Sequence, residues 1–254
     1  MRLANKNILI NGGTKGVART LIPVLLNEGA NVIFSGRDVE AAKKIFNNIS
    51  IKDRSNLHFV ATDLSKINDC NILVNSAINR FGELHGFVNY SGITPVASLE
   101  DCSEEVFDEV FSINIKAPFF LTQWVVKSFK SNGGGSIVLI GSPHSWGGQK
   151  DRSVYAVSKG ALYTLSEHIA KNYAEDQIRC NFVTMGWTAT DGELLLRKEQ
   201  GVTKEDLQKE ASKFIPMKRM TTAEDQIPAI IYLLSDESKM VTGSNFRITG
   251  GEYI

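Results

Sequence analysis

Tyr155 and Lys159 stand four residues apart in a segment that reads Ser-Val-Tyr-Ala-Val-Ser-Lys. On a helix this spacing places both side chains on one face, a single turn apart. A free phenol loses its proton near pH ~10, and a nearby cation lowers that pKa because it stabilises the phenolate. The spacing indicates a Tyr that exchanges protons with a substrate, an effect worth about 10²–10⁴ in rate. A Tyr and a Lys at this spacing are more often an ordinary helix surface, so a second motif is needed.

A glycine-rich turn near the N-terminus is that second motif. An apolar run at 7–11 precedes Gly12-Gly13-Thr14-Lys15-Gly16-Val17-Ala18, and an apolar-rich helical stretch follows at 19–29. A strand, a tight turn and a helix in this order let a pyrophosphate approach the backbone at the positive end of the helix. Another apolar run at 31–35 completes a βαβ unit. The segment predicts a dinucleotide site, although ordinary βα turns are also rich in glycine.

The residues after the second apolar run bear on the choice of cofactor. An acid at this point would bind the ribose 2′-hydroxyl of NAD(H), whereas an Arg accepts the 2′-phosphate of NADP(H). The chain reads Ser35-Gly36-Arg37 here, and Lys15 in the glycine turn is a second cation. Asp38 follows one position later and weakens the argument slightly. These residues favour NADP(H) over NAD(H). The alternative is that Lys15 and Arg37 are ordinary solvated charges.

Together with further motifs, these residues make the chain resemble the short-chain dehydrogenase/reductase family over nearly its whole length. The glycine turn is similar to the family motif Thr-Gly-x-x-x-Gly-x-Gly, and Tyr155 and Lys159 match its Tyr-x-x-x-Lys. The other matching elements follow in the family's order: Asp63, Asn89-Tyr90-Ser91-Gly92, Asn114, Ser142 and residues 181–190. Some positions depart from the family pattern: Asn11, Ala18, Tyr90, Ser91, Met185 and Thr249.

The resemblance implies a catalytic tetrad of Asn114, Ser142, Tyr155 and Lys159. In the family, the Tyr donates or accepts the substrate proton, and the Lys lowers its pKa and binds the nicotinamide ribose. The Ser polarises the substrate oxygen, and the Asn anchors a water that relays protons. The cofactor carries the hydride. The implied cofactor contacts are Gly12, Thr14, Lys15, Gly16, Val17, Arg37, Asp63, Leu64, Asn89, Gly92, Tyr155, Lys159, Gly186, Thr188 and Thr190.

Apolar runs that alternate with helical stretches must position these residues. The runs predict strands at 7–11, 31–35, 58–61, 86–89, 136–140, 178–183 and 245–249. Further helices are predicted at 39–48, 66–81, 103–131, 153–174 and 224–235. This alternation predicts the α/β class, with a Rossmann-like, doubly wound parallel seven-stranded sheet and helices on both faces. Because ligands bind beyond the carboxyl ends of such strands, residues that follow strand ends should share one rim: Gly12, Asp63, Asn89, Ser142 and Gly186.

Residues 187–220 form an insertion that we interpret as a small helical lid over the substrate. Leu194–Leu196 and 202–214 are typical of short amphipathic helices. The predicted substrate contacts are Ser142, His144, Trp146, Gln149, Tyr155 and Trp187, with the Leu194–Leu196 cluster as a further candidate. The alternative is that the apolar members of this set only pack the lid.

The bulk composition agrees with one α/β domain over residues 1–254, of which 43% are apolar and 22% charged. Lys plus Arg equal Asp plus Glu at 28 each, so no nucleic-acid surface is indicated. Cys70, Cys102 and Cys180 have neither disulfide nor zinc spacing, and the four His residues show no metal spacing. With no apolar run of membrane-spanning length, we expect a cytoplasmic protein that binds no membrane.

The sequence therefore predicts an NADP(H)-dependent oxidoreductase that interconverts a ketone or aldehyde and an alcohol. Two alternatives stay open: an epimerase or other net non-redox enzyme on the same fold, and a non-catalytic protein that binds or senses NADP(H). Family members usually assemble through two long helices, here 103–131 and 153–174, so a homotetramer or homodimer is expected. The physiological substrate is not predictable from the residues.

Overall fold

The computed structural model describes residues 1–252, except for the side chains of Leu196 and Lys204. Within this part, the strands form one parallel sheet of seven in the order β3-β2-β1-β4-β5-β6-β7. The strands are β1 Asn7–Asn11, β2 Asn31–Gly36, β3 Leu57–Ala61, β4 Gly86–Asn89, β5 Gly135–Gly141, β6 Ile178–Met185 and β7 Asn245–Ile248. The predicted doubly wound fold is confirmed, with the chain crossing from one side of β1 to the other after β3.

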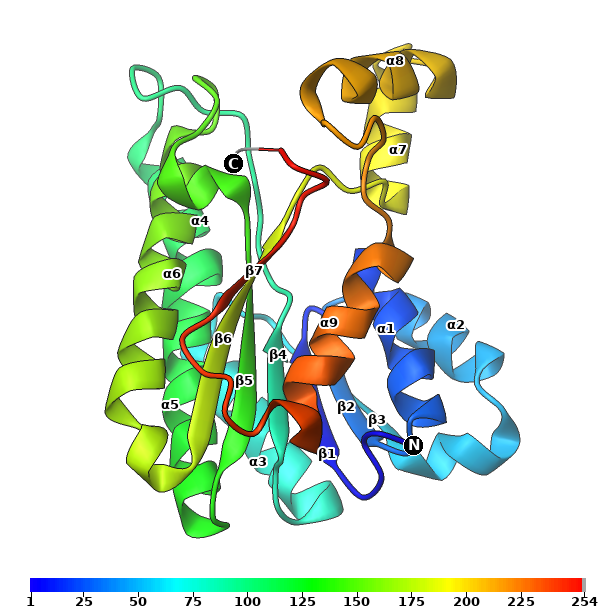
Figure 1. Ribbon diagram of the computed structural model, residues 1–254, viewed down its shortest axis with the longest axis vertical. Coiled ribbons are helices and arrows are strands. Elements are labelled where there is room, and N and C mark those ends of the chain that lie inside the picture. The colour runs from blue at the N-terminus through cyan, green and yellow to red at the C-terminus, as the bar shows by residue number, and fades with distance from the viewer. Residues whose placement is uncertain (253–254) are drawn as a thin grey trace.

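Two apolar cores cover the two faces of this sheet. Ile8 and Ile10 of β1 point into one core and Leu9 into the other, because side chains alternate along a strand. The first core packs under α1 Gly16–Asn27, α2 Val39–Asn48 and α9 Ala223–Leu234. The second packs under α3 Ile67–Phe81, α5 Ala117–Ser131 and α6 Ser153–Asn172. Both faces of the sheet are therefore shielded from water, and its edge of carboxyl ends is left for a site (Figure 1).

The predicted helix at 103–131 is not a continuous α-helix. It consists of α4 Glu104–Phe111, a π-helical segment Ser112–Lys116, and α5, which begins at Ala117. Pro118 near the start of α5 has no N–H and would clash with the carbonyl four residues earlier, that of Asn114. A wider turn at this point relieves the clash, and it sets Asn114 inside the molecule with no exposed surface.

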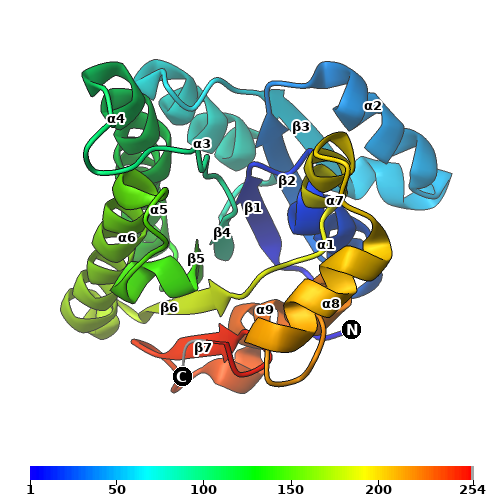
Figure 2. The same ribbon diagram turned by 90° about the horizontal axis from the view of Figure 1, so that it is seen from above.

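Two short helices of the 187–220 insertion stand beyond the end of β6, where lid helices were expected. They are α7 Asp191–Glu199 and α8 Lys204–Phe214. Leu207, Ala211 and Ile215 form a small core of their own, against which Trp187 and Leu194 pack. Leu196 belongs to the predicted apolar cluster, but its side chain lies outside the described residues. Seen from above, α7 and α8 lie on the α1 side of the sheet (Figure 2).

The described residues also bear on several expected absences. Cys70, Cys102 and Cys180 are free thiols. Within residues 1–252, no cluster of His, Cys, Asp or Glu side chains has an arrangement that would hold a metal ion. No helix in this range combines the length and the apolar character that crossing a bilayer requires.

Gly141, which ends β5 just before Ser142, has no room for a larger residue. A Cβ atom at this position would lie 1.9 Å from Cζ of the buried Phe182. We expect Gly141→Ala to lower the free energy of unfolding by about 1–3 kcal/mol, measured by urea denaturation, because the Phe182 ring must move. Gly192→Ala is the control, since an added Cβ there meets only one atom, at 4.0 Å. Equal stability of the two variants would contradict the expectation, and Phe182→Leu in the Gly141→Ala background should restore part of the loss.

Candidate active site

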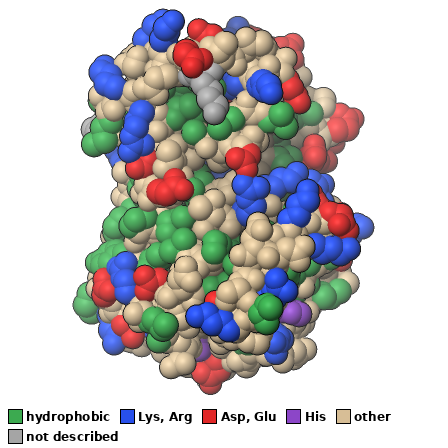
Figure 3. Space-filling view, turned by 90° about the vertical axis from the view of Figure 1, so that its right-hand side faces the viewer, with side chains coloured by type: hydrophobic (Ala, Val, Ile, Leu, Met, Phe, Trp, Pro, Cys, Tyr) green, Lys and Arg blue, Asp and Glu red, His purple; other side chains and the backbone are tan. Residues whose placement is uncertain are grey.

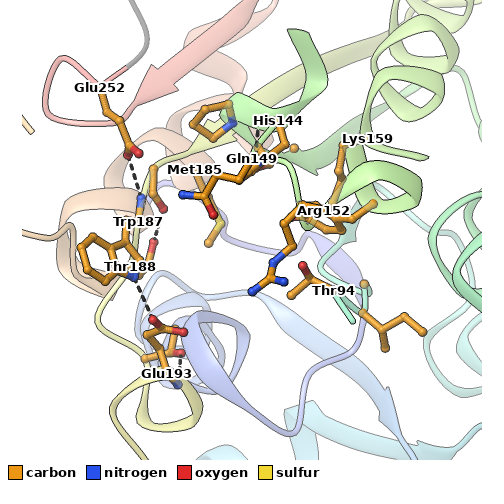
Figure 4. Close-up of a pocket in the computed structure, with 18 of the residues that line it drawn as sticks. Thr94, His144, Gln149, Arg152, Lys159, Met185, Trp187, Thr188, Glu193 and Glu252 are labelled. Atoms are coloured by element: carbon orange, nitrogen blue, oxygen red, sulfur yellow. Dashed lines mark hydrogen bonds between the residues drawn. The ribbon is translucent and has the colours of Figure 1, made fainter. Parts of the chain in front are cut away.

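A cleft of about 1140 Å³ opens at the carboxyl ends of the strands. One wall comes from the ends of β4 and β5 and the first turns of α6, including Gly92, Ser142 and Tyr155. The other wall comes from the segment after β6 and from the lid, including Trp187 and Glu193. Figure 4 shows side chains from both walls pointing into this space. The cleft is large enough for a small organic ligand.

Ser142, Tyr155 and Lys159 converge on this cleft, as their spacing predicts. Ser142 caps the short 3₁₀ turn Pro143–Trp146, where its Oγ accepts a hydrogen bond of 3.3 Å from His144 N. Tyr155 lies in the first turn of α6 and hydrogen-bonds with Ser142. The Lys159 amine lies 5.8 Å from the centre of the Tyr155 ring and donates a 2.9 Å hydrogen bond to the Ile140 carbonyl. A hydroxyl pair therefore stands at the cleft wall with a buried amine behind it.

The electrostatics differ from the sequence expectation for Tyr155. Burial raises the pKa of its phenol, whereas the hydrogen bond with Ser142 and the charge of Arg152 act in the opposite direction without reversing it. Burial also lowers the pKa of Lys159 to about 8, because this residue is only 5% exposed and its amine loses solvation as a cation. In the protein without cofactor, Tyr155 is thus a protonated acid at neutral pH rather than a group poised to ionise.

Asn114 is held at the same place by the π-helical segment. Its Oδ1 accepts a 2.8 Å hydrogen bond from Ile93 N, and its Nδ2 donates to Ile93 O and to Ser158 Oγ, each at 3.0 Å. A Cβ atom on Gly92 would lie 3.4 Å from Lys159 Nζ and 3.5 Å from Asn114 Oδ1. The amide and the amine therefore flank Gly92 from the same side, next to the cleft.

The glycine turn has the form that a dinucleotide requires. Gly12 has φ +74°, and a Cβ atom there would crowd Ser91 N at 3.1 Å. No side chain caps the start of α1, and its first turn carries no acid, so its backbone N–H groups and positive end suit an anion. Asn11, which replaces the family Thr, donates to Asn89 Oδ1 at 2.7 Å and accepts from Tyr90 N at 3.0 Å. These bonds tie β1 to the end of β4 beneath the turn.

The rim beside this turn is basic. Lys15 and Arg37 are exposed. The neighbouring Asp38 is engaged elsewhere, since its Oδ1 accepts a 2.8 Å hydrogen bond from Ala41 N and so caps α2. Figure 3 shows Lys and Arg side chains gathered below a waist in the molecule, on the side of α2. The rim beside the glycine turn therefore carries two exposed cations.

Comparison with known proteins agrees with this geometry. A family model described as enoyl-(acyl carrier protein) reductase matches residues 12–252. An uncharacterised oxidoreductase of Thermotoga maritima is 34% identical over 99% of this chain and 98% of its own. The NADP-dependent (R)-specific alcohol dehydrogenase of Lentilactobacillus kefiri is 30% identical over 98% of this chain and 97% of its own. A solved short chain dehydrogenase/reductase family protein superimposes with a TM-score of 0.87 at 28% identity, covering 100% of this chain and 99% of that one.

The chain belongs to the short-chain dehydrogenase/reductase family. Members of this family are oxidoreductases that use NAD(P)(H) and act on small molecules. The residues above fit such a cofactor, because α1 begins at the glycine turn with no side-chain cap and no acid in its first turn, and the amine of Lys159 lies beside Gly92. The family resemblance of the sequence is thereby confirmed.

The other predicted cofactor residues of this short-chain dehydrogenase/reductase lie near the carboxyl ends of the strands and make different contacts there. Asp63 accepts a 2.8 Å hydrogen bond from Ser65 Oγ, which holds the pKa of its carboxyl below the usual range. The Thr188 hydroxyl donates to Gly186 O at 2.8 Å and accepts from Gln226, so a cofactor contact of Thr188 would come from its backbone. Thr190 Cγ2 lies 3.6 Å from the Cβ position of Gly16. The remaining ones stand along the turn and the strand ends: Thr14, Val17, Leu64, Asn89 and Gly186.

Of the predicted substrate contacts, His144, Gln149 and Trp187 line the cleft together with Ser142 and Tyr155. Trp146 does not line it, which corrects the sequence expectation. Its ring lies 5.2 Å from the Tyr163 ring, under the Arg247 guanidinium at 5.1 Å, because the 3₁₀ turn directs it outward.

Several cleft residues were missed by sequence reasoning: Ile93, Thr94, Arg152, Met185, Arg197 and Glu252. Most belong to segments without a residue pattern of their own. Arg152 is the exception, because it precedes Tyr155 by three positions at the start of a helix. Residues at this spacing share a helix face, so the position of Arg152 was predictable.

Proposed function

We propose that this protein is an NADP(H)-dependent oxidoreductase that interconverts a ketone or aldehyde and the corresponding alcohol. The observation that carries the proposal is the placement of Ser142, Tyr155 and Lys159 in one cleft. The cleft reaches Thr190, whose Cγ2 lies 3.6 Å from where a Cβ atom on Gly16 of the glycine turn would stand. A carbonyl in the cleft would therefore meet both the hydroxyl pair and the nicotinamide end of a dinucleotide bound along the turn.

Ser142, Tyr155 and Lys159 assist the reaction by stabilising the negative charge that develops during proton and hydride transfer to the carbonyl. NADPH, when bound, supplies the hydride that reduces the carbonyl carbon and leaves as NADP⁺. The Tyr155 phenol gives its proton to the oxygen, so the product is a neutral alcohol and Tyr155 becomes the phenolate. Ser142 donates a hydrogen bond to the same oxygen and stabilises the negative charge that develops there. The Lys159 ammonium, behind the Tyr155 ring, stabilises the phenolate once it forms.

Three features support NADP(H) over NAD(H). Lys15 and Arg37 are exposed beside the glycine turn, where two cations can bind a 2′-phosphate. The one nearby acid after β2, Asp38, caps α2 and is therefore not directed at a ribose hydroxyl. The Lentilactobacillus kefiri relative is named as NADP-dependent.

The raised pKa of Tyr155 predicts that the two reaction directions respond differently to pH. Reduction needs the protonated phenol, which predominates at neutral pH, so its rate should change little between pH 6 and 8. Oxidation needs the phenolate, whose fraction grows up to tenfold per pH unit below the pKa, so its rate should rise steeply. Initial rates in both directions across this range measure the difference. Parallel profiles would contradict a proton role for Tyr155.

The direct test is to titrate the purified protein with NADPH by fluorescence and then follow NADPH oxidation across a panel of aldehydes and ketones. Binding followed by carbonyl-dependent oxidation supports the proposal. A product with an inverted centre and no net cofactor oxidation would instead indicate an epimerase, which labelled cofactor detects. Tight NADPH binding without turnover of any carbonyl would favour a sensor.

We further expect a homo-oligomer, a tetramer or a dimer, in the cytoplasm. Phe107, Phe119 and Val157 expose 44%, 48% and 59% of their surface on α4, α5 and α6. Apolar side chains of this size are candidates for burial between subunits. Size-exclusion chromatography with light scattering measures the state, and a monomer at micromolar concentration would contradict this expectation.

A further inference from the structure

Arg152 stands where a substrate group beside the reacting oxygen would lie. It immediately precedes α6, and Tyr155 follows in the first turn of that helix. Both side chains line the cleft. Figure 4 shows the Arg152 guanidinium extending into the open space from the wall that also carries Lys159. Its positive charge acts on both Tyr155 and His144, which places it close to the two of them.

One edge of this guanidinium is anchored and the other is available. Arg152 Nη1 donates to the carbonyl oxygen and to the carboxylate Oδ2 of Asp151, each at 3.1 Å. Among residues 1–252, Nη2 and Nε have no hydrogen-bond partner. The side chain is 23% exposed, so it is fixed in place and partly shielded from water. A planar fork with unused N–H groups matches the two oxygens of a carboxylate.

Asp151 is the acid of the cleft wall that pairs with Arg152, through Nη1, and among the described residues the other acids of the cleft make no ion pair with the guanidinium. Glu193 accepts hydrogen bonds of 2.9 Å from both Trp187 Nε1 and Arg197 Nε. Glu252 accepts from Trp187 N at 3.1 Å. Glu210 is contributed by the lid helix α8. Figure 4 shows Glu193 and Glu252 on the wall opposite Arg152. The wall that carries the reacting hydroxyls therefore presents the Nη2 and Nε groups of Arg152, whose Nη1 is paired with Asp151.

We propose that Arg152 forms an anion subsite for the substrate, which is a small oxo acid in the reductive direction and a hydroxy acid in the oxidative one. The carboxylate binds the free edge of Arg152 while the carbonyl oxygen meets Ser142 and Tyr155. Because Arg152 caps the start of α6 and Tyr155 lies in the first turn of that helix, both lining the cleft, the carboxylate and the reacting carbon are separated by a few bonds. This assignment rests on the proposed carbonyl chemistry and names the substrate class for it.

The test compares each of three oxo acids, pyruvate, acetoacetate and levulinate, with its own methyl ester. In the wild-type protein, kcat/KM should be at least tenfold higher for one of the acids than for its ester. Arg152→Gln should lower that acid's kcat/KM by about 10- to 100-fold and leave the ester nearly unchanged, because only the acid loses charged hydrogen bonds. Arg152→Lys should keep part of the preference. Arg54→Gln is the matched control, since Arg54 is exposed before β3, at the opposite end of the strands.

A binding measurement keeps the test independent of turnover. The NADPH complex is titrated with 3-hydroxybutyrate, which cannot react with a reduced cofactor, and with its methyl ester. The wild-type complex should bind the acid at least tenfold more tightly than Arg152→Gln does, and the ester equally. If only the oxidoreductase proposal were wrong, no substrate would be turned over, but the wild-type complex would still bind the acid more tightly than Arg152→Gln does. The anion subsite would be overturned if the wild-type protein used and bound the acids and their esters equally. It would also be overturned if Arg152→Gln lowered kcat/KM equally for acid and ester and shifted the pH profile.

Discussion

Replacing Tyr155 with Phe is expected to lower kcat for carbonyl reduction by about 10²–10⁴-fold, to or below the detection limit. The substitution removes the phenol proton and leaves the ring, which packs beside His144 at 5.6 Å between ring centres. As the substrate carbonyl accepts the hydride, negative charge would then develop on its oxygen, and only Ser142 would remain to stabilise that charge. Steady-state NADPH oxidation with an active carbonyl substrate measures the loss.

Two controls separate this effect from damage to the fold. NADPH binding should be within a few-fold of wild type, because the phenyl ring fills the same volume. Tyr163→Phe removes another phenol of α6, one that packs against Trp146 and Phe182 outside the cleft, and it should keep nearly full activity. If Tyr155→Phe retained wild-type kcat on a genuine substrate, Tyr155 would not be the proton donor.

The double substitution Lys15→Ala and Arg37→Ala is expected to weaken NADPH binding by about 100-fold while leaving NADH binding unchanged. Each cation would contribute one charged hydrogen bond to the 2′-phosphate, worth ~1.5 kcal/mol at the lower end because both side chains are solvated. NADH lacks the phosphate and loses nothing. Fluorescence titration with each cofactor measures the two affinities.

Lys43→Ala serves as the matched control, since Lys43 is paired with Glu40 at 2.8 Å on α2. It should leave the NADPH affinity unchanged. Asp38→Ala should cost about 1 kcal/mol of stability through the lost cap, without a gain of NADH binding. Preference for NADH in the wild-type protein, or equal weakening of both cofactors in the double variant, would contradict the proposed role of these cations.

The arrangement of the sheet was predictable because it depends on local patterns. The apolar run at 7–11 became β1, with alternate side chains in the two cores, and the glycine turn after it became the start of α1. Residues that follow strand ends share one rim in any parallel sheet. The convergence of Ser142 with the Tyr155–Lys159 pair therefore followed from strand order and helical spacing alone.

The break of the predicted 103–131 helix has a local cause in Pro118, whereas other departures arise where a property depends on surroundings that no local pattern encodes. The pKa of Tyr155 is one, since burial raises it, while the hydrogen bond with Ser142 and the charge of Arg152 act in the opposite direction. The Trp146 ring points away from the cleft, where it packs against the Tyr163 ring and the Arg247 guanidinium.

Residue types and their spacing thus determined the fold, the family and the chemically active groups of this protein. Only the tertiary structure decided their protonation and the direction in which each side chain points. The physical reason is that secondary structure and strand order depend on periodicity along the chain. Desolvation and side-chain contacts depend on the atoms that other segments bring within a few ångströms.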